Sequence, residues 1–283
     1  LDGKLLWKQD LGVLDTGFFY DPDYQWADAS SPVLYKDTVI LQCDLQKGSF
    51  LAAFDLATGK RRWTTAREEL PSWGTPTIVH GPSRTELVTN GIQQIRGYDP
   101  ETGKELWHLK TGNSMIAAAT PVYRSGLIVV GNGYQPMKPL YAIRPGARGD
   151  ISLGDAESSA AVAWSRKSGG PYYTTPLLYG DHLYVLSEGG VLANYYARTG
   201  ELIYQQRVGG EGGTFSASPV AADGYLYLAS EEGDVYVIKD GIEYQQVAVN
   251  PVGELVIATP AIAGHAVYIR TRHAVLGFGD VPH

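Results

Sequence analysis

The fold is decided by the stretch Asp55-Leu56-Ala57-Thr58-Gly59-Lys60, which leads to Trp63 and recurs along the chain. Further copies lead from Gly103 to Trp107, from Gly200 to Tyr204 and from Gly3 to Trp7. In every copy the aromatic residue comes four positions after the glycine. Glycine supplies the positive φ of a tight turn, and the even offset places each aromatic side chain on the same face of the strand that follows.

A Ser/Thr-Pro pair marks the same repeat at a second point. Six pairs are present: Ser31-Pro32, Thr75-Pro76, Thr120-Pro121, Thr175-Pro176, Ser218-Pro219 and Thr259-Pro260. Their prolines lie 44, 45, 55, 43 and 41 residues apart. A period of about 40–50 residues is typical of one four-stranded propeller blade.

Between these markers, short alternating apolar stretches are separated by turn residues. His182-Leu183-Tyr184-Val185-Leu186 and Tyr225-Leu226-Tyr227-Leu228 each follow a turn with Gly and Asp. Such alternation predicts strands. We therefore predict an all-β chain, a β-propeller of four-stranded antiparallel blades with six repeats in a single domain over residues 1–283. The blades are expected to start near residues 31, 75, 120, 175, 218 and 259.

The two ends of the sequence leave two alternatives open. The stretch after Thr259 predicts three strands, and Leu1 to Leu11, with its own Gly-Lys turn and Trp7, predicts a fourth. Pairing these segments would complete the last blade and close a six-blade ring without a free edge. Alternatively, residues 1–11 are the end of a missing blade, and the chain is part of an eight-bladed propeller.

Composition excludes several classes of protein. With 34 glycines, 16 prolines and 44% apolar residues among 283, the chain is rich in turns and can bury a large core. The net charge of −7 argues against a nucleic-acid partner, which needs a clustered basic surface. No run of 18 apolar residues is present, so we expect no membrane span. Cys43, the single cysteine, has no partner for a disulfide within the chain, and we expect no metal site.

The order Ser/Thr-Pro, Gly turn, Thr-Gly-Lys and Trp resembles the pyrroloquinoline-quinone (PQQ) type of repeat. It is carried by Ser31 to Trp63, Thr75 to Trp107 and Thr175 to Tyr204. More narrowly, the segments 2–7, 142–151 and 217–220 resemble a group of bacterial PQQ-like repeat proteins related to the outer-membrane assembly scaffold lipoprotein. The resemblance implies an eight-bladed propeller with about two further blades ahead of Asp2, and an extracytoplasmic, periplasmic setting.

The resemblance does not imply the cofactor. Quinoprotein dehydrogenases of this repeat type use a stacked Trp, a calcium bound by Glu and Asn, a catalytic Asp and a vicinal Cys-Cys disulfide. The single Cys43 excludes the disulfide, and no Glu/Asn/Asp set can be matched residue by residue. We therefore expect no bound PQQ.

Candidate binding residues follow from propeller topology. Loops from the fourth strand to the next first strand share one face with the loops between second and third strands, and function tends to lie on that face or along the axis. The residues in these loops with side chains suited to binding are Trp26, Asp28, Asp44, Trp73, Tyr134, Tyr172, Tyr173, Glu188, Phe215, Arg270 and Arg272.

Two longer segments stand out from the repeat. Phe18 to Trp26 has five aromatic residues and two acids where we expect a loop, and it either contacts a peptide or carbohydrate or plugs the channel mouth. The repeat from Thr120 is about ten residues longer than the others, between Tyr141 and Trp164. The extra length joins the third and fourth strands, so we expect a surface excursion on the opposite face and outer rim, with partner docking as the alternative.

No catalytic constellation is recognisable in the sequence: HxH, HExxH, GxSxG and phosphate-loop patterns are missing. The first hypothesis is therefore a non-catalytic binding or scaffold propeller that presents its channel face to a protein, peptide or glycan ligand. The alternative is an enzyme with an axial site, either a degenerate quinoprotein dehydrogenase or a hydrolase or lyase.

Overall fold

The computed structural model describes residues 3–18, 21–112, 115–134, 136–209 and 213–279. The chain divides into two compact units, Leu1–Lys167 and Ser168–His283, and each is described by itself. Strands, turns and loops make up the described residues of both units, which contain no helix. None of these residues therefore forms a helix with the length and apolar character that crossing a membrane requires.

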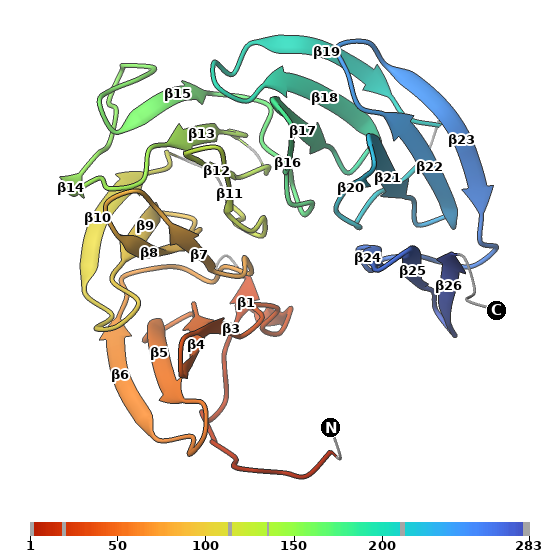
Figure 1. Ribbon diagram of the computed structural model, residues 1–283. Helices are drawn as coiled ribbons and strands as arrows, with labels where there is room; N and C mark the ends of the chain where they lie inside the picture. The colour runs from red at the N-terminus through yellow and green to blue at the C-terminus, as the bar shows by residue number, and fades with distance from the viewer. Residues whose placement is uncertain (1–2, 19–20, 113–114, 135, 210–212, 280–283) are drawn as a thin grey trace. The chain divides into compact units, whose positions relative to one another are not determined.

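The first unit contains three blade-like sheets and a two-stranded ribbon. The ribbon pairs β1 (Gly17–Phe18) with β2 (Asp21–Gln25). The first sheet consists of β3 (Val33–Tyr35), β4 (Thr38–Cys43), β5 (Phe50–Asp55) and β6 (Arg61–Ala66). The second consists of β7 (Thr77–His80), β8 (Thr85–Thr89), β9 (Gln94–Tyr98) and β10 (Glu105–Lys110), joined by β14 (Gly149–Asp150). The third consists of β11 (Val122–Arg124), β12 (Leu127–Gly131), β13 (Leu140–Ile143) and β15 (Val162–Arg166). The strands follow one another in antiparallel order, except for β14 (Figure 1).

The second unit repeats this organisation. One sheet consists of β16 (Leu177–Tyr179), β17 (His182–Leu186), β18 (Val191–Tyr196) and β19 (Leu202–Arg207). The next consists of β20 (Val220–Ala222), β21 (Tyr225–Ala229), β22 (Asp234–Lys239) and β23 (Gln245–Pro251). Among the described residues the last sheet has three strands, β24 (Ala261–Ala263), β25 (Ala266–Arg270) and β26 (Val275–Gly279). The predicted four-stranded antiparallel blades are therefore confirmed, whereas the closed ring of six and the part of an eight-bladed ring both stay predictions.

The Ser/Thr-Pro pairs mark the start of each sheet. The first strand of every sheet begins directly after the proline, which suits a residue without an N–H at the entry to a strand. The hydroxyl group has a second role, because it links successive blades. The Ser31 N–H donates to the Thr75 hydroxyl at 3.0 Å, and the Thr175 N–H donates to the Ser218 hydroxyl at 2.9 Å. The Ser218 N–H in turn donates to the Thr259 hydroxyl at 3.1 Å.

Trp7 and Trp63 each pack on the glycine turn of the next repeat. A Cβ atom on Gly59 would lie 2.6 Å from the Trp7 ring, and one on Gly103 would lie 2.5 Å from the Trp63 ring. The Trp7 indole also donates to the Leu56 carbonyl at 2.8 Å. Both glycines have positive φ, at 70° and 72°. Glycine is thus required twice, for the backbone conformation and for the space that the indole fills.

Trp107 is packed differently from Trp7 and Trp63. It is fully buried in its own sheet, where a Cβ on Gly97 would lie 2.2 Å from its Nε1. Its indole N–H donates to the Glu86 carboxylate at 2.8 Å. The reason lies in the third sheet, where the long segment between β13 and β15 replaces the short glycine turn.

This long segment does not simply cross the outer rim, as the sequence predicts. Its strand β14 pairs in parallel with β10, so that Trp107 lies opposite Gly149 and His108 opposite Asp150. The Gly146 N–H donates to Glu86 at 2.8 Å and fixes the start of the segment. The insertion therefore extends the neighbouring sheet by one strand.

Apolar side chains fill the space between successive sheets of each unit. One cluster contains Trp107 and Ile95 from the second sheet and Ile128 and Val130 from the third. Equivalent clusters lie between the first and second sheets and, in the second unit, between its successive sheets. Burial of both sheet faces explains why so few residues of the chain are charged.

Residues 3–11 form no strand, yet Trp7 occupies the position on Gly59 that Trp63 occupies on Gly103. Gln9 adds a hydrogen bond from its side-chain amide to the Gly59 carbonyl at 2.9 Å. The segment therefore lies where the outer strand of a preceding blade would lie. Its pairing with the last blade stays a prediction.

Candidate functional site

Three aromatic side chains, Tyr24, Trp26 and Trp73, form a row in the first unit, here called the aromatic platform, in which Tyr24 meets Trp26 edge-to-face and Trp26 is tilted against Trp73. The ring centroids of Tyr24 and Trp26 are 5.9 Å apart, and those of Trp26 and Trp73 are 5.1 Å apart. Tyr24 is 59% and Trp26 40% exposed, whereas Trp73 is 9% exposed. The platform therefore presents two rings to solvent on a third that is anchored in the protein.

The backbone beneath the platform is held in a strained conformation. Ala27 has a φ of 61°, in the left-handed region that side chains other than glycine rarely adopt. The Trp73 indole donates to the Ala27 carbonyl at 3.0 Å, and the Trp73 N–H donates to the Ala117 carbonyl at 2.8 Å. Such strain persists only where the surroundings enforce it, and it concentrates at functional sites.

The ribbon that carries Tyr24 is tied to the loop between β4 and β5. The Gln46 N–H donates to the Asp15 carbonyl at 2.8 Å, and the Gln46 side-chain amide donates to the Gly17 carbonyl at 2.6 Å. The Gln25 side-chain amide donates to the Asp15 carboxylate at 2.9 Å. The predicted loop 18–26 thus contains paired strands, of which residues 19–20 lie outside the described residues.

Negative charge surrounds the platform. Residues 9–35 contain five aspartates and no lysine, arginine or histidine. Asp28 is half-buried directly after Ala27, and the Ser30 N–H donates to its carboxylate at 3.2 Å. Burial raises the pKa of Asp28, and the negative charge of Asp44 adds to the rise. A cation brought next to Asp28 would relieve this unfavourable environment.

Asp44 lies in a buried ionic network behind the platform. Its carboxylate accepts two hydrogen bonds from the Arg67 guanidinium, at 2.7 and 3.0 Å, and both side chains are 0% exposed. The Gln42 amide donates to the same carboxylate at 2.8 Å, and the hydroxyl of Ser72, the residue before Trp73, donates to it at 2.5 Å. Burial by itself lowers the pKa of Arg67, but the charge of Asp44 outweighs it and keeps the guanidinium protonated.

The network continues into the second sheet. Arg67 donates to the Tyr98 hydroxyl at 2.8 Å and to the Thr89 hydroxyl at 2.9 Å. Arg96 donates to the buried carboxylate of Glu69 at 2.9 Å. Two carboxylates and two guanidinium groups balance each other, so the network fixes residues 67–73 and thereby the position of Trp73.

The predicted site residues separate into groups. Trp26, Asp28, Asp44 and Trp73 come together in the first unit, but Asp44 is buried and acts by positioning. Tyr134 is exposed in the loop between β12 and β13. In the second unit, the ring centroids of Tyr172 and Tyr173 lie 3.7 Å apart, and Glu188 is half-buried. Arg270 and Arg272 line a small hollow together with Leu255 and Ile257.

Phe215 does not present a surface to a ligand, although the sequence places it among the rim residues. Its ring is 0% exposed and packs in the core, where a Cβ on Gly190 would lie 2.9 Å from it. The Tyr236 ring lies 6.0 Å away. Position in a loop before a Ser/Thr-Pro pair therefore does not by itself give exposure.

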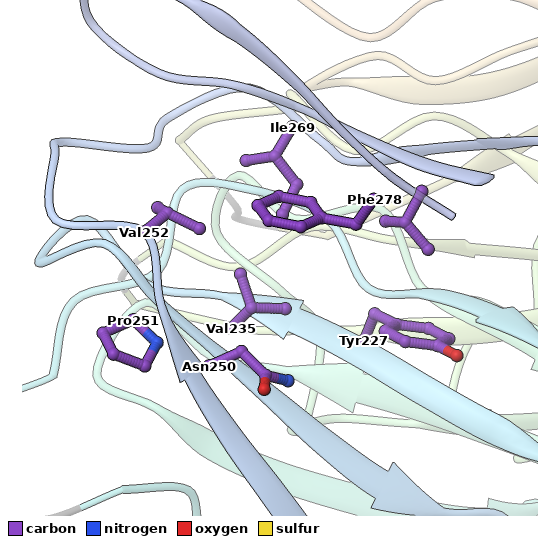
Figure 2. A pocket seen from close by; sticks show the side chains of 8 residues that line it. Tyr227, Val235, Asn250, Pro251, Val252, Ile269 and Phe278 are labelled. Atoms are coloured by element: carbon purple, nitrogen blue, oxygen red, sulfur yellow. The ribbon is translucent and has the colours of Figure 1, made fainter. Parts of the chain in front are cut away.

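An apolar hollow of about 400 Å³ lies in the second unit between the β20–β23 and β24–β26 sheets (Figure 2). Val252, Ile269 and Phe278 face Val235 and Tyr227 across it, and Asn250 supplies the side-chain amide. This lining offers no convergent set of polar groups, so the hollow does not have the chemistry of a catalytic site.

Two features of quinoprotein dehydrogenase sites, the vicinal disulfide and the metal centre, can be compared with the described residues. Cys43 is buried, and burial, followed by the charges of Asp28 and Asp44, raises the pKa of its thiol to about 12. As the single cysteine it cannot form a vicinal disulfide. In the part of the chain that the structure describes, no group of three or more His, Cys, Asp or Glu side chains could hold a metal ion.

Comparisons with known proteins agree with the fold. The quinoprotein alcohol dehydrogenase PedE of Pseudomonas putida is 30% identical over 142 residues, which cover 45% of this chain and 22% of that protein. The chain thus spans about a fifth of the length of this curated relative. BamB from Moraxella catarrhalis has a TM-score of 0.52 at 14% identity, over 90% of this chain and 86% of that chain. The quinohemoprotein alcohol dehydrogenase from Comamonas testosteroni has a TM-score of 0.62 at 12% identity, over 89% of this chain and 52% of that chain.

At these identities the solved structures show the fold alone, and they confirm the predicted β-propeller class. The sequence itself matches the family described as outer membrane protein assembly factor BamB over residues 1–137 and 91–278. These ranges together span nearly the whole chain. The chain therefore belongs to the PQQ-type repeat family described as outer membrane protein assembly factor BamB.

Proposed function

We propose that the chain is a non-catalytic binding scaffold that holds an extended, basic segment of a partner protein on the aromatic platform. The observation that carries this proposal is the pairing of exposed Tyr24 and Trp26 rings with the half-buried carboxylate of Asp28. Exposed aromatic rings on a rigid support are the usual anchors of protein interfaces.

Charge favours a basic segment over a neutral glycan. The segment 9–35 carries only negative charges, and a partner cation between Trp26 and Asp28 would gain both a cation–π contact and an ion pair. The family description, which refers to outer membrane protein assembly, supports a protein as the partner and an extracytoplasmic location.

The rigidity of the support adds to the argument. Trp73 is fixed by two hydrogen bonds to backbone carbonyls, one from its indole and one from its own N–H, and by the ionic network at Ser72. The support of the Trp26 ring is therefore ordered before a ligand docks, which lowers the entropy cost of binding. A plug that only closes the channel mouth would not need its rings exposed or its backbone strained at Ala27.

A peptide titration tests the proposal. The full chain is titrated with a short synthetic peptide that alternates arginine with leucine, and with a matched peptide that has glutamate in place of arginine. We expect saturable binding of the arginine peptide that weakens with salt, and weak or no binding of the glutamate peptide. Trp26→Ala should weaken binding about tenfold or more, because anchor residues contribute at least ~2 kcal/mol.

The matched control is Tyr225→Ala, which removes an exposed ring from the second unit and should leave binding unchanged. Equal binding of both peptides, or equal affinity of wild type and Trp26→Ala, would contradict the proposal.

A quinoprotein dehydrogenase is the second candidate, and the 30% identity to PedE favours it. The missing vicinal cysteines and metal ligands in the described residues count against it. Addition of PQQ and Ca²⁺ to the full chain distinguishes the two. A rise in thermal stability together with alcohol-dependent dye reduction would support the dehydrogenase hypothesis. No change in either measurement would reject that hypothesis.

A further inference from the structure

The insertion after β13 builds a second hollow, of about 400 Å³, in the first unit. One wall comes from the end of β10, another from the end of β15, and the insertion supplies Ser152, Leu153, Gly154 and Ala156. Sequence comparison of the repeats singles out this insertion as extra length, and the platform makes no use of it.

Three cations converge on the hollow in a chain that is acidic overall. All three line it: Lys110 and Lys167 are exposed, and Arg166 is half-buried. Of the described residues that line the hollow, none carries a carboxylate. Acids adjoin the lining in the insertion. The Asp150 carboxylate accepts the Ser152 N–H at 2.9 Å, and its hydrogen bonds with Ser152, helped by the charge of Lys110, lower its pKa. Asp155 and Glu157 are exposed on either side of the lining residue Ala156.

Hydrogen bonds tie the insertion to the chain beside Lys110 and beside Arg166. The Ile151 N–H donates to the His108 carbonyl at 2.9 Å, and the Lys110 N–H donates to the Ser152 hydroxyl at 3.0 Å. On the other side, the Ser165 hydroxyl donates to the Glu157 carbonyl at 2.9 Å. The insertion is thereby attached to both walls, next to Lys110 and next to Arg166.

The remaining lining is apolar. Met137, Pro139, Tyr141 and Leu153 contribute side chains that are half-buried or buried, and the Tyr141 hydroxyl is directed to the Thr111 carbonyl at 3.2 Å. The hollow thus combines a cationic rim with an apolar floor, within the size range of small-molecule sites.

We propose that this hollow binds an organic phosphate monoester, with the phosphate between Arg166, Lys110 and Lys167 and the organic group over Met137 and Leu153. A guanidinium group matches phosphate oxygens in a bidentate fashion, and two ammonium groups balance the remaining charge of a dianion. The site is separate from the aromatic platform, whose partner is basic.

The test is calorimetric titration of the full chain with phenyl phosphate, inorganic phosphate and phenol. We expect saturable binding of phenyl phosphate, at least about tenfold weaker binding of inorganic phosphate and no binding of phenol. The double variant Lys110→Gln/Lys167→Gln should weaken phenyl phosphate binding about tenfold or more, since each charged hydrogen bond is worth ~1.5–3 kcal/mol. Both lysines are exposed, so this variant should keep the melting temperature of the wild type.

The matched control is Lys104→Gln, which removes one exposed charge from the same sheet at the turn before β10 and should leave the affinity within about twofold of wild type. Three results would overturn the proposal: no saturable binding of phenyl phosphate, equal affinity of inorganic phosphate, or equal affinity of the double lysine variant. Arg166→Lys keeps the charge but loses the bidentate geometry, and we expect an affinity between those of wild type and the double variant.

Discussion

Removal of the Asp44 carboxylate is the sharpest perturbation of the support behind the platform. In Asp44→Ala, Arg67 loses both contacts to a charged partner and keeps the Tyr98 and Thr89 hydroxyls. Removing one partner of a buried ion pair costs about 3–5 kcal/mol, because the other charge is left uncompensated. Native domains are stable by about 5–15 kcal/mol, so this loss is a large fraction of the total.

The assay is urea unfolding followed by tryptophan fluorescence, on wild type, Asp44→Ala, Arg67→Met and the double variant. Removing both charges also removes the unpaired group, so the double variant should be less destabilised than the sum of the single variants by about 1–3 kcal/mol. Asp37→Ala is the control in the same sheet, because it breaks an exposed ion pair with Arg62 and should cost little. If Asp44→Ala costs no more than Asp37→Ala, or if the single effects add, the network does not have the role described.

Three further predictions concern charge, packing and turns. Asp28→Asn should raise the free energy of unfolding at pH 7 and weaken arginine-peptide binding. The raised pKa of Asp28 means that folding favours its protonated form, so the stability of the wild type falls as the pH rises through that pKa. In pH-dependent unfolding curves, the difference in stability between variant and wild type should vanish at a pH below the ordinary range of aspartate. Trp107→Ala should destabilise the chain by about 3–5 kcal/mol, since it empties a fully buried site and leaves the Glu86 carboxylate without its indole donor; an unchanged urea midpoint would contradict this packing. Gly103→Ala should lower the melting temperature more than Gly126→Ala, because both glycines have positive φ but only Gly103 is covered by the Trp63 ring; equal losses in calorimetric scans would show that the ring contact contributes nothing.

The repeat architecture could be predicted from the sequence because its signals are local. The Ser/Thr-Pro pairs precede the first strand of every blade-like sheet, and the turns at Gly59, Gly103 and Gly200 precede the fourth strands β6, β10 and β19. The spacing of these markers can be read from the sequence without knowing which sheets pack together. The role of the Ser/Thr hydroxyl could not be predicted, because it depends on a contact between blades. The hydroxyl accepts a hydrogen bond from the backbone N–H of the equivalent residue one blade earlier.

The depth of individual loop side chains could not be predicted. Asp44 and Phe215 lie in loops, as expected, but one is paired with Arg67 in the interior and the other packs in the apolar core. Loop position gives the face of a blade and not the distance from solvent. The Arg67-Glu68-Glu69 charge run was the available signal for the network, since it directly follows β6.

Two further features depend on contacts that leave little trace in the sequence. The strand β14 has two residues and forms only because the edge of β10 is open beside the insertion. The left-handed conformation of Ala27 is enforced by Trp73, 46 positions away, at a residue type that does not favour it. Tyr24 joins the platform because β2 orients it toward Trp26.

The most direct test of the platform as a binding site is hydrogen–deuterium exchange of the full chain with and without the arginine-leucine peptide. The proposal predicts protection on binding within residues 21–30 and 70–75, which carry Tyr24, Trp26, Asp28 and Trp73. It predicts no change at the insertion, residues 144–161, in the same sample. Protection confined to other segments, with residues 21–30 and 70–75 unchanged at saturating peptide, would contradict the account.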